Sequence, residues 1–422
     1  MAKPLKIFFS CSGVGVIYRG IESFFREAFE GLRHTEGLDL TLYKGAGNEK
    51  ADERVLWNIP RTSKTAKALG RIIGRSSYAT EQLTTLPSMV RAIRREKPDI
   101  IYYSDANLGF QLYRWRKQIG VPYRLLFSNG GPVHPPFDRT DYVHQVTPFY
   151  YDEAIAAGES PKRQRMVPYG ISVPSGDPEE PGPIREKLRR QLGLPFDRRI
   201  VLSVGWISAI HKRMDYVVRE IARLPMPRPF LLMLGAIDKE SEQVMALARD
   251  RLGEENFAVR SVIYQQVDDY YRGADLFVLA SLKEGFGRVF LEALIHGLPV
   301  IAHDHPVARF VLGEEGIFGD LTKEGALATL ISVSSRKSVT LEEMRRRRAR
   351  VRERFSWPVL APQYREMFYD CFAKVHPFKE TYPPGFRTVA DRGEACDLLF
   401  RAFVSSGHSI DRRNYRKASP IL

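Results

Sequence analysis

Short apolar runs alternate with amphipathic stretches along most of the chain, and this alternation limits the possible folds more than any other feature. A helix is predicted from about Ile21, where apolar residues repeat with helical spacing, and further helices near 61–74 and 86–96. The apolar runs of the first half have the length of strands: LKIFFSC at 5–11, LDLTLYK at 38–44, DIIYYSD at 99–105 and YRLLFSN at 123–129. Strand followed by helix, repeated, is typical of a doubly wound parallel sheet.

A second series of the same kind follows in the other half. Helices are predicted at 216–224, 241–252 and 288–296 between five apolar runs: RRIVLSVGW at 198–206, PFLLMLG at 229–235, FAVRSVIY at 257–264, ADLFVLAS at 274–281 and LPVIAHD at 298–304. Between the two series, PYGISVPSGDPEEPGP at 168–183 collects proline, glycine and acidic residues without periodicity, as interdomain linkers do.

The predicted fold class is therefore α/β, with two Rossmann-like doubly wound parallel-sheet domains that face a central cleft. We expect an N-terminal domain over 1–172, a linker over 173–183 and a C-terminal domain over 184–357. Residues 358–422 are expected to form a C-terminal helix that returns towards the N-terminal domain, followed by a tail with no assignment after His376. A chain of 422 residues, 44% of them hydrophobic, is long enough to bury a core in each domain.

Composition limits the cellular compartments and the kinds of binding partner that can be expected for this protein. No stretch approaches the ~18 consecutive apolar residues that cross a bilayer, and the glycines at Gly13 and Gly15 interrupt the apolar N-terminus, which we interpret as strand, turn and helix. Three cysteines are too few for a disulfide framework, which favours a reducing compartment. We expect a cytoplasmic protein, with peripheral attachment at the inner membrane surface left open. The net charge of +14 indicates an anionic partner.

The segment ADLFVLASLKEGFGRVFLEALIHGLPVIAHD at 274–304 carries the clearest chemistry. A predicted strand ends in a polar loop, Gly285 and Gly287 allow close backbone approach, and a helix begins near Arg288 with its free N–H groups facing that loop. This arrangement predicts an anion site at the carboxyl end of the strands. Glu284 and Glu292 would repel a phosphate, so we expect them to accept hydrogen bonds from hydroxyl groups on either side of it.

This segment resembles the donor-site motif of retaining glycosyltransferases of family 4, which have the GT-B fold, and the resemblance extends from about Ile200 to Ala373. It implies transfer of a sugar from a nucleoside diphosphate sugar with retention of configuration. Glu284, Gly285, Phe286 and Gly287 would hold the donor sugar, and Glu292 would hold the ribose.

A second segment, VLSVGWISAIHKRMDYVV at 201–218, supports the same resemblance. A strand is predicted to end at Gly205, and the family places an arginine and a lysine after it to neutralise the donor diphosphate. Lys212 matches the lysine, whereas Trp206 replaces the arginine, so Arg213 or Arg288 is expected to supply the missing charge. The resemblance favours front-side attack, in which the departing phosphate takes the acceptor proton while Lys212 stabilises its charge.

The N-terminal half matches more weakly. Gly13 and Gly15 follow the first strand without the GxGxxG spacing, so they either approach the donor phosphate or the acceptor, as in the family, or form only a tight turn. His134, in NGGPVHPP, is the candidate for a histidine near the reacting sugar. The sequence His303, Asp304 and His305 lies at a strand end without further ligands, so we expect no metal site and no cofactor besides the donor.

Two basic stretches bear on partners. Five cations recur at helical spacing and define a face for an anionic membrane, although a surface helix packed on the first domain is the favoured interpretation: Arg61, Lys64, Lys67, Arg71 and Arg75. The arginine run at 345–348 is interpreted as a solvated helix face in preference to a nucleic-acid site, and nucleic acid is not an expected partner.

The sequence thus predicts a glycosyltransferase whose acceptor is a glycan, a lipid or a small molecule. Two alternatives of other kinds stay open. One is a GT-B-like sugar phosphorylase or nucleotide-sugar epimerase, which phosphate dependence without added acceptor would reveal. The other is a non-catalytic basic protein that binds acidic lipid or nucleic acid, with strong salt dependence and no turnover.

Overall fold

A computed structural model describes residues 3–131, 133–335 and 338–374. Its first domain contains a seven-stranded sheet in the order β3-β2-β1-β4-β5-β6-β7, with every pairing parallel. The strands are β1 (Leu5–Cys11), β2 (Leu38–Lys44), β3 (Glu53–Val55), β4 (Ile100–Tyr103), β5 (Arg124–Asn129), β6 (Tyr142–Gln145) and β7 (Gln164–Met166). The helices are α1 (Gly20–Leu32), α2 (Lys64–Ile72), α3 (Ser77–Glu96), α4 (Ala106–Arg114), α5 (Arg116–Ile119) and α6 (Pro148–Ala156), with a 3-10 turn η1 (Pro161–Arg163).

The second domain contains a six-stranded parallel sheet in the order β10-β9-β8-β11-β12-β13. Its strands are β8 (Ile200–Val204), β9 (Phe230–Leu234), β10 (Phe257–Arg260), β11 (Leu276–Leu279), β12 (Val300–His303) and β13 (Gly316–Gly319). Its helices are α7 (Pro181–Leu192), α8 (Met214–Ala222), α9 (Lys239–Leu252), α10 (Tyr264–Gly273), α11 (Arg288–Ile295), α12 (Pro306–Leu312), α13 (Ala326–Ser334) and α14 (Leu341–Phe355), with 3-10 turns η2 (Glu254–Asn256) and η3 (Gly313–Glu315).

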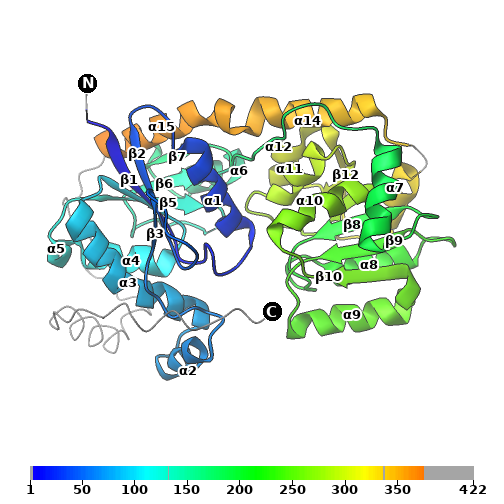
Figure 1. The fold of residues 1–422 in the computed structure, drawn as a ribbon, viewed down its shortest axis with the longest axis horizontal. Coiled ribbons are helices and arrows are strands. Elements are labelled where there is room, and N and C mark those ends of the chain that lie inside the picture. The colour runs from blue at the N-terminus through cyan, green and yellow to red at the C-terminus, as the bar shows by residue number, and fades with distance from the viewer. Residues whose placement is uncertain (1–2, 132, 336–337, 375–422) are drawn as a thin grey trace.

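The predicted fold class is confirmed: two doubly wound parallel-sheet domains stand side by side (Figure 1). In each sheet the strand order reverses once, between β1 and β4 in the first domain and between β8 and β11 in the second. Ligands of such sheets bind outside the carboxyl ends of the strands at this reversal. The predicted anion site follows β11, so the topology places it at the switch point of the second sheet.

The chain crosses between the domains twice, and the two crossings touch. Ile171 pairs with Ser356 in an isolated parallel bridge, and the Ile171 amide donates to the Phe355 carbonyl at 2.9 Å. Helix α15 (Trp357–Lys374) then lies along the N-terminal domain, and α14 and α15 together extend across both domains (Figure 1). Helix α7 begins at Pro181, inside the segment predicted as linker, because proline suits the first turn of a helix. The tail after His376 lies outside the described residues.

The arginine run of α14 differs in part from the predicted solvated face. Arg345 and Arg346 are exposed, but Arg347 is buried and Arg348 half-buried. Arg347 Nη1 donates to the Gly297 carbonyl at 2.8 Å, and Arg348 Nε donates to the Ile295 carbonyl at 2.7 Å. These arginines therefore satisfy the free carbonyls at the end of α11 instead of facing water.

The basic stretch 61–75 also departs from one continuous helical face. Arg61 precedes α2, is buried, and donates from Nε to Glu81 at 2.8 Å while its guanidinium lies 4.1 Å from the centre of the Tyr78 ring. Arg75 follows the end of α2. The expectation that α2 packs its apolar face on the domain is wrong for Ile72, which is 81% exposed. The spacing of the cations in the sequence could not show that Arg61 is buried in contact with a buried carboxylate.

A tryptophan wedge joins the crossing point to the N-terminal domain. Trp357 is 6% exposed and packs near Phe24 and Tyr364, with ring centroids 6.2 and 5.7 Å away. A Cβ on Gly31 of α1 would lie 2.3 Å from Trp357 Cγ, and one on Gly170 would lie 2.8 Å from the same ring. Only the absence of these two side chains leaves room for the indole.

Replacement of Trp357 by alanine should lower the free energy of unfolding by about 3–5 kcal/mol, because two glycines cannot fill the space that the indole leaves. Urea titration followed by circular dichroism measures this loss. Trp57→Ala is the matched control, since Trp57 is 41% exposed, and should cost less than about 1 kcal/mol. Equal losses in the two variants would contradict the wedge.

Candidate functional site

The loop from β11 to α11 brings its backbone close to the switch point. Gly287 has φ +79°, a left-handed conformation that favours glycine, and a Cβ there would lie 2.6 Å from the Phe290 ring. Phe286 is buried and fixes the middle of the loop. Helix α11 begins at Arg288, so its first N–H groups point to the space in front of the loop.

The neighbouring loop from β8 to α8 depends on two further glycines. Gly205 and Gly235 have φ values of +150° and +159°, and a Cβ on Gly235 would lie 1.7 Å from the Gly205 carbonyl oxygen. A Cβ on Gly205 would lie 3.1 Å from Lys212 Cε. The aliphatic part of Lys212 therefore lies over the end of β8, where the positive φ and the close contact both favour glycine.

Lys212 and Glu284 meet directly. Lys212 Nζ donates to Glu284 Oε1 at 2.5 Å, and the two side chains are 23% and 16% exposed. These residues are 72 positions apart in the sequence, and each was predicted from a separate motif. The pairing of β8 with β11 brings them together at one point. In this structure the ammonium group of Lys212 is therefore already paired with an anion.

Glu292 lies further along α11 and is half-buried. Its Oε2 accepts a hydrogen bond from the Tyr271 hydroxyl at 2.9 Å. Desolvation raises the pKa of Glu292, while the Arg288 charge opposes this shift. The Tyr271 ring is buried and stacks on His296 at 5.5 Å between centroids. Tyr271 was not predicted, because one tyrosine in an amphipathic helix carries no signal of its own.

Both candidates for a second phosphate-binding cation are engaged elsewhere in this structure. Arg213 Nη1 donates to the Leu321 carbonyl at 2.7 Å. Arg288 is buried, pairs with Glu27 of α1 at 2.5 Å and donates to the Gly170 carbonyl at 2.8 Å. Of the three predicted cations, Lys212 is the one paired with Glu284.

Trp206, which stands in place of the family arginine, contacts two other side chains of its domain. Its Nε1 donates to Asp238, the residue before α9, at 2.9 Å. Its ring stacks on His211 with centroids 5.5 Å apart. Trp206 therefore ties the loop after β8 to the start of α9, and supplies no charge in place of the family arginine.

The N-terminal candidates are placed as follows. A Cβ on Gly13 would lie 2.4 Å from the Glu22 carboxylate, and Gly15 has φ +81° with a Cβ position 2.2 Å from the Ala46 carbonyl oxygen. A side chain at either position would therefore clash within the domain, and the approach of these glycines to the donor phosphate or the acceptor stays a prediction. His134 is exposed, and its Nδ1 lies 3.1 Å from Glu153 of α6.

The strand end at 303–305 is occupied by local contacts. His303 Nδ1 accepts from the Leu321 amide at 3.2 Å, and Asp304 pairs with Arg309 at 2.5 Å. Within 3–131, 133–335 and 338–374, no group of three or more His, Cys, Asp or Glu side chains is arranged to hold a metal ion.

Comparison with known proteins agrees with this geometry. Residues 184–350 match the family described as "Glycosyl transferases group 1". D-inositol 3-phosphate glycosyltransferase of Thermobispora bispora is 30% identical over 245 residues, which cover 53% of this chain and 54% of that protein. The chain spans about a third to a half of the length of the curated relatives that it matches.

Two solved structures share the fold. Sucrose-phosphate synthase from Thermosynechococcus elongatus aligns with a TM-score of 0.70 at 19% identity, over 88% of this chain and 100% of that one. Anabaena HepE in complex with UDP-glucose aligns with a TM-score of 0.67 at 18% identity, over 86% and 99%. The fold is therefore GT-B. Within it, residues 184–350 match the group 1 glycosyltransferase family, which agrees with the resemblance predicted from the motif at 284–292.

A double-mutant cycle tests the contact at the centre of the site. Lys212→Met, Glu284→Gln and the double variant should reveal a coupling of about 1 kcal/mol in the free energy of unfolding, because the pair is largely shielded from water. The exposed pair Glu186 and Arg190 of α7, 2.6 Å apart, is the control and should give about 0.3–0.5 kcal/mol. A coupling of zero between Lys212 and Glu284 would show that the two side chains are independent.

Proposed function

We propose that the protein transfers a sugar from a nucleoside diphosphate sugar to an acceptor with retention of configuration. The contact of Lys212 with Glu284 at the switch point of the second sheet carries this proposal. It joins a phosphate-neutralising cation to a hydroxyl-accepting carboxylate, and a nucleotide sugar has a diphosphate directly beside a sugar. The group 1 match and the neighbour solved with UDP-glucose support a donor of this class.

Donor binding then rearranges the ion pair. The diphosphate takes the ammonium group of Lys212 and the free N–H groups at the start of α11. Glu284, released from Lys212, accepts a hydrogen bond from a donor-sugar hydroxyl. Glu292 accepts from the ribose, for which it exchanges its present bond with Tyr271. One anion thus replaces another beside Lys212.

The reaction proceeds on one face of the sugar. The bond between the anomeric carbon and the phosphate oxygen breaks as the acceptor oxygen attacks from the same side. The acceptor proton passes to the departing phosphate, and Lys212 with the α11 dipole stabilises the charge that develops there. His134 is kept as the candidate near the reacting sugar, since it is held by Glu153 on α6, the helix whose Tyr150 contacts the Glu284 carbonyl.

The acceptor is a glycan, a lipid or a small molecule. A sugar phosphorylase or a nucleotide-sugar epimerase is the second candidate, since the GT-B fold alone does not distinguish them. Incubation with nucleotide sugars, with and without acceptor and inorganic phosphate, separates the three: transfer needs an acceptor, phosphorolysis needs phosphate, and epimerisation needs neither.

Glu284→Gln should lower the rate of transfer on the order of a hundredfold, because the neutral amide loses the charged acceptor for a sugar hydroxyl. Coupled release of nucleoside diphosphate measures the rate, and thermal unfolding checks the fold. Glu240→Gln, an exposed residue of the same domain, is the control and should keep full activity. Full activity in Glu284→Gln would remove this residue from the site.

Transfer is proposed to need no metal, since Lys212 and the start of α11 supply the positive charge. Activity should therefore survive dialysis against EDTA, as judged by initial rates before and after treatment. Complete loss that magnesium or manganese restores would show that a metal ion supplies part of this charge.

We also propose that α2 attaches the protein to an anionic membrane surface. The side chain of Ile72 is exposed, and so are four cations on α2 or shortly after it: Lys64, Lys67, Arg71 and Arg75. Such a face combines electrostatic attraction with an apolar anchor. Within the described residues no helix is both long and apolar enough to cross a bilayer, so this attachment would be peripheral.

Reversal of Lys64, Lys67 and Arg71 to glutamate should abolish sedimentation with phosphatidylglycerol vesicles, because each cation contributes about 1 kcal/mol. Reversal of Lys239, Arg249 and Arg251, exposed on α9, is the control and should leave binding intact. Binding of the unaltered protein should fall at 1 M salt, where the Debye length is ~3 Å. Failure of the unaltered protein to bind these vesicles at low salt would exclude the membrane.

A further inference from the structure

One carboxylate of the N-terminal domain holds three segments together. Glu27 of α1 accepts from Arg288 Nη2 through Oε1 at 2.5 Å and from the Ser172 amide through Oε2 at 3.0 Å. Arg288 also donates to the Gly170 carbonyl at 2.8 Å. Helix α1, the interdomain linker and the start of α11 therefore meet at Glu27.

This contact is shielded and directional. The side chains of Arg288 and Glu27 are 4% and 12% exposed, and charge-assisted hydrogen bonds of this kind are short and specific in geometry. Arg288 directly follows the loop Gly285–Gly287 that would hold the donor sugar. A shift of α1 relative to the second domain would therefore move the end of this loop.

The other end of the same loop is also held from the N-terminal domain. The Tyr150 hydroxyl of α6 donates to the Glu284 carbonyl at 2.9 Å. Tyr150 is buried, and desolvation raises the pKa of its hydroxyl to about 12. The segment from Glu284 to Arg288 is thus anchored at both ends by residues outside its own domain.

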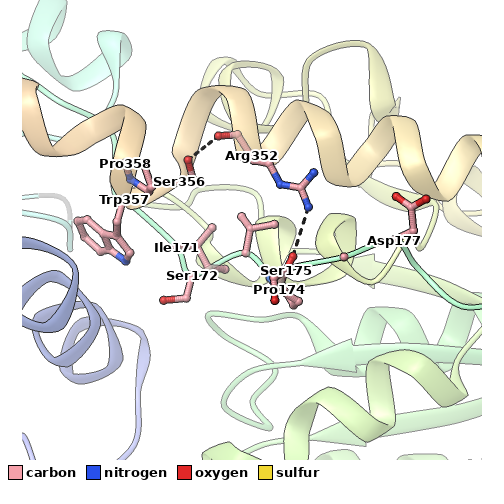
Figure 2. Close-up of a pocket in the computed structure, with 11 residues that line it drawn as sticks. Ile171, Ser172, Pro174, Ser175, Asp177, Arg352, Ser356, Trp357 and Pro358 are labelled. Carbon is pink, nitrogen blue, oxygen red and sulfur yellow. Dashed lines mark hydrogen bonds between the residues drawn. The ribbon is translucent and has the colours of Figure 1, made fainter.

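The interdomain linker, which Glu27 contacts, is itself held in place by neighbouring helices. Figure 2 shows residues 171–177 lying along the end of α14 and the start of α15, with Trp357 between the linker and α1. Arg352 Nη2 donates to the Pro174 carbonyl at 3.3 Å. A pocket of about 610 Å³ borders the linker on this side. The linker is therefore held by α14 and by Glu27, with space left beside it.

We propose that Glu27 and Tyr150 are positioning residues through which the N-terminal domain sets the place of the donor-sugar loop. Sugar transfer then requires the arrangement in which both domains contact this loop, whereas the nucleoside diphosphate binds to groups of the second domain alone. The measurement of kcat that tests this inference rests on the proposed function. The measurement of amide exchange in the loop rests on the structure alone.

Glu27→Gln and Tyr150→Phe test the inference. Each should lower kcat by about tenfold to a hundredfold, since a misplacement of about 1 Å has effects of this size, while the Kd for nucleoside diphosphate changes less than threefold. Glu30→Gln on α1, whose carboxylate pairs with Arg26 and Arg33, and Tyr151→Phe on α6 are the controls and should keep the original kcat. An unchanged kcat in both test variants would overturn the proposal, and a lowered melting temperature without a fall in kcat would assign Glu27 to stability alone.

Hydrogen–deuterium exchange gives a result that does not depend on activity. Amides in 284–290 should exchange at least about tenfold faster in Glu27→Gln than in Glu30→Gln, because the loop loses an anchor. Unchanged exchange there would also overturn the proposal. If no nucleotide sugar is turned over by the unaltered protein, the proposed function fails, and this exchange experiment still decides whether Glu27 positions the loop.

Discussion

The parallel pairing of β8 with β11 is the constraint on which the candidate site depends. It places two loops from distant parts of the sequence at one edge of a sheet, and it does so through backbone hydrogen bonds that are independent of the loop residues. The loops can then be built for chemistry, with glycines at Gly205, Gly235 and Gly287 in conformations or spaces that other residues tolerate poorly. Lys212 and Glu284 meet because the sheet brings them together.

The fold class and the centre of the candidate site could be predicted from the sequence. Nine of the described strands lie in continuous apolar runs, so their positions could be predicted to within a few residues. The strands β3, β6, β7 and β13 were not predicted, because each has only three or four residues and includes polar residues or glycine. Helix α3 was predicted from about Leu86 but begins at Ser77, because the Ser76 side chain caps it and Pro87 is accommodated inside it. Glu284 and Lys212 were predictable from motifs. The burial of Arg61 and the contact of Arg288 with the N-terminal domain could not be predicted, since both depend on carboxylates that are distant in sequence.

Many of the positively charged side chains form hydrogen bonds within the protein. Parallel α/β domains leave helix ends and linker carbonyls without partners, and guanidinium groups can satisfy several of them at once. Arg347 and Arg348 do so at the end of α11, and Arg163 donates to the carbonyls of Phe137 and Thr140. A net charge of +14 therefore overstates the charge available for an anionic partner. The exposed cations of α2 are among those that such a partner could reach.

The position of α15 makes the N-terminal domain discontinuous in sequence. Phe368 lies against Phe9 and Tyr102 of the first sheet, with ring centroids 6.0 and 5.6 Å away, and the Tyr364 hydroxyl donates to the Pro168 carbonyl at 3.0 Å. During synthesis the first domain leaves the ribosome long before this helix exists. Its core therefore stays open until the whole second domain has been translated, and the interval exposes apolar surface to other chains. The second domain, which is continuous, is free to fold first.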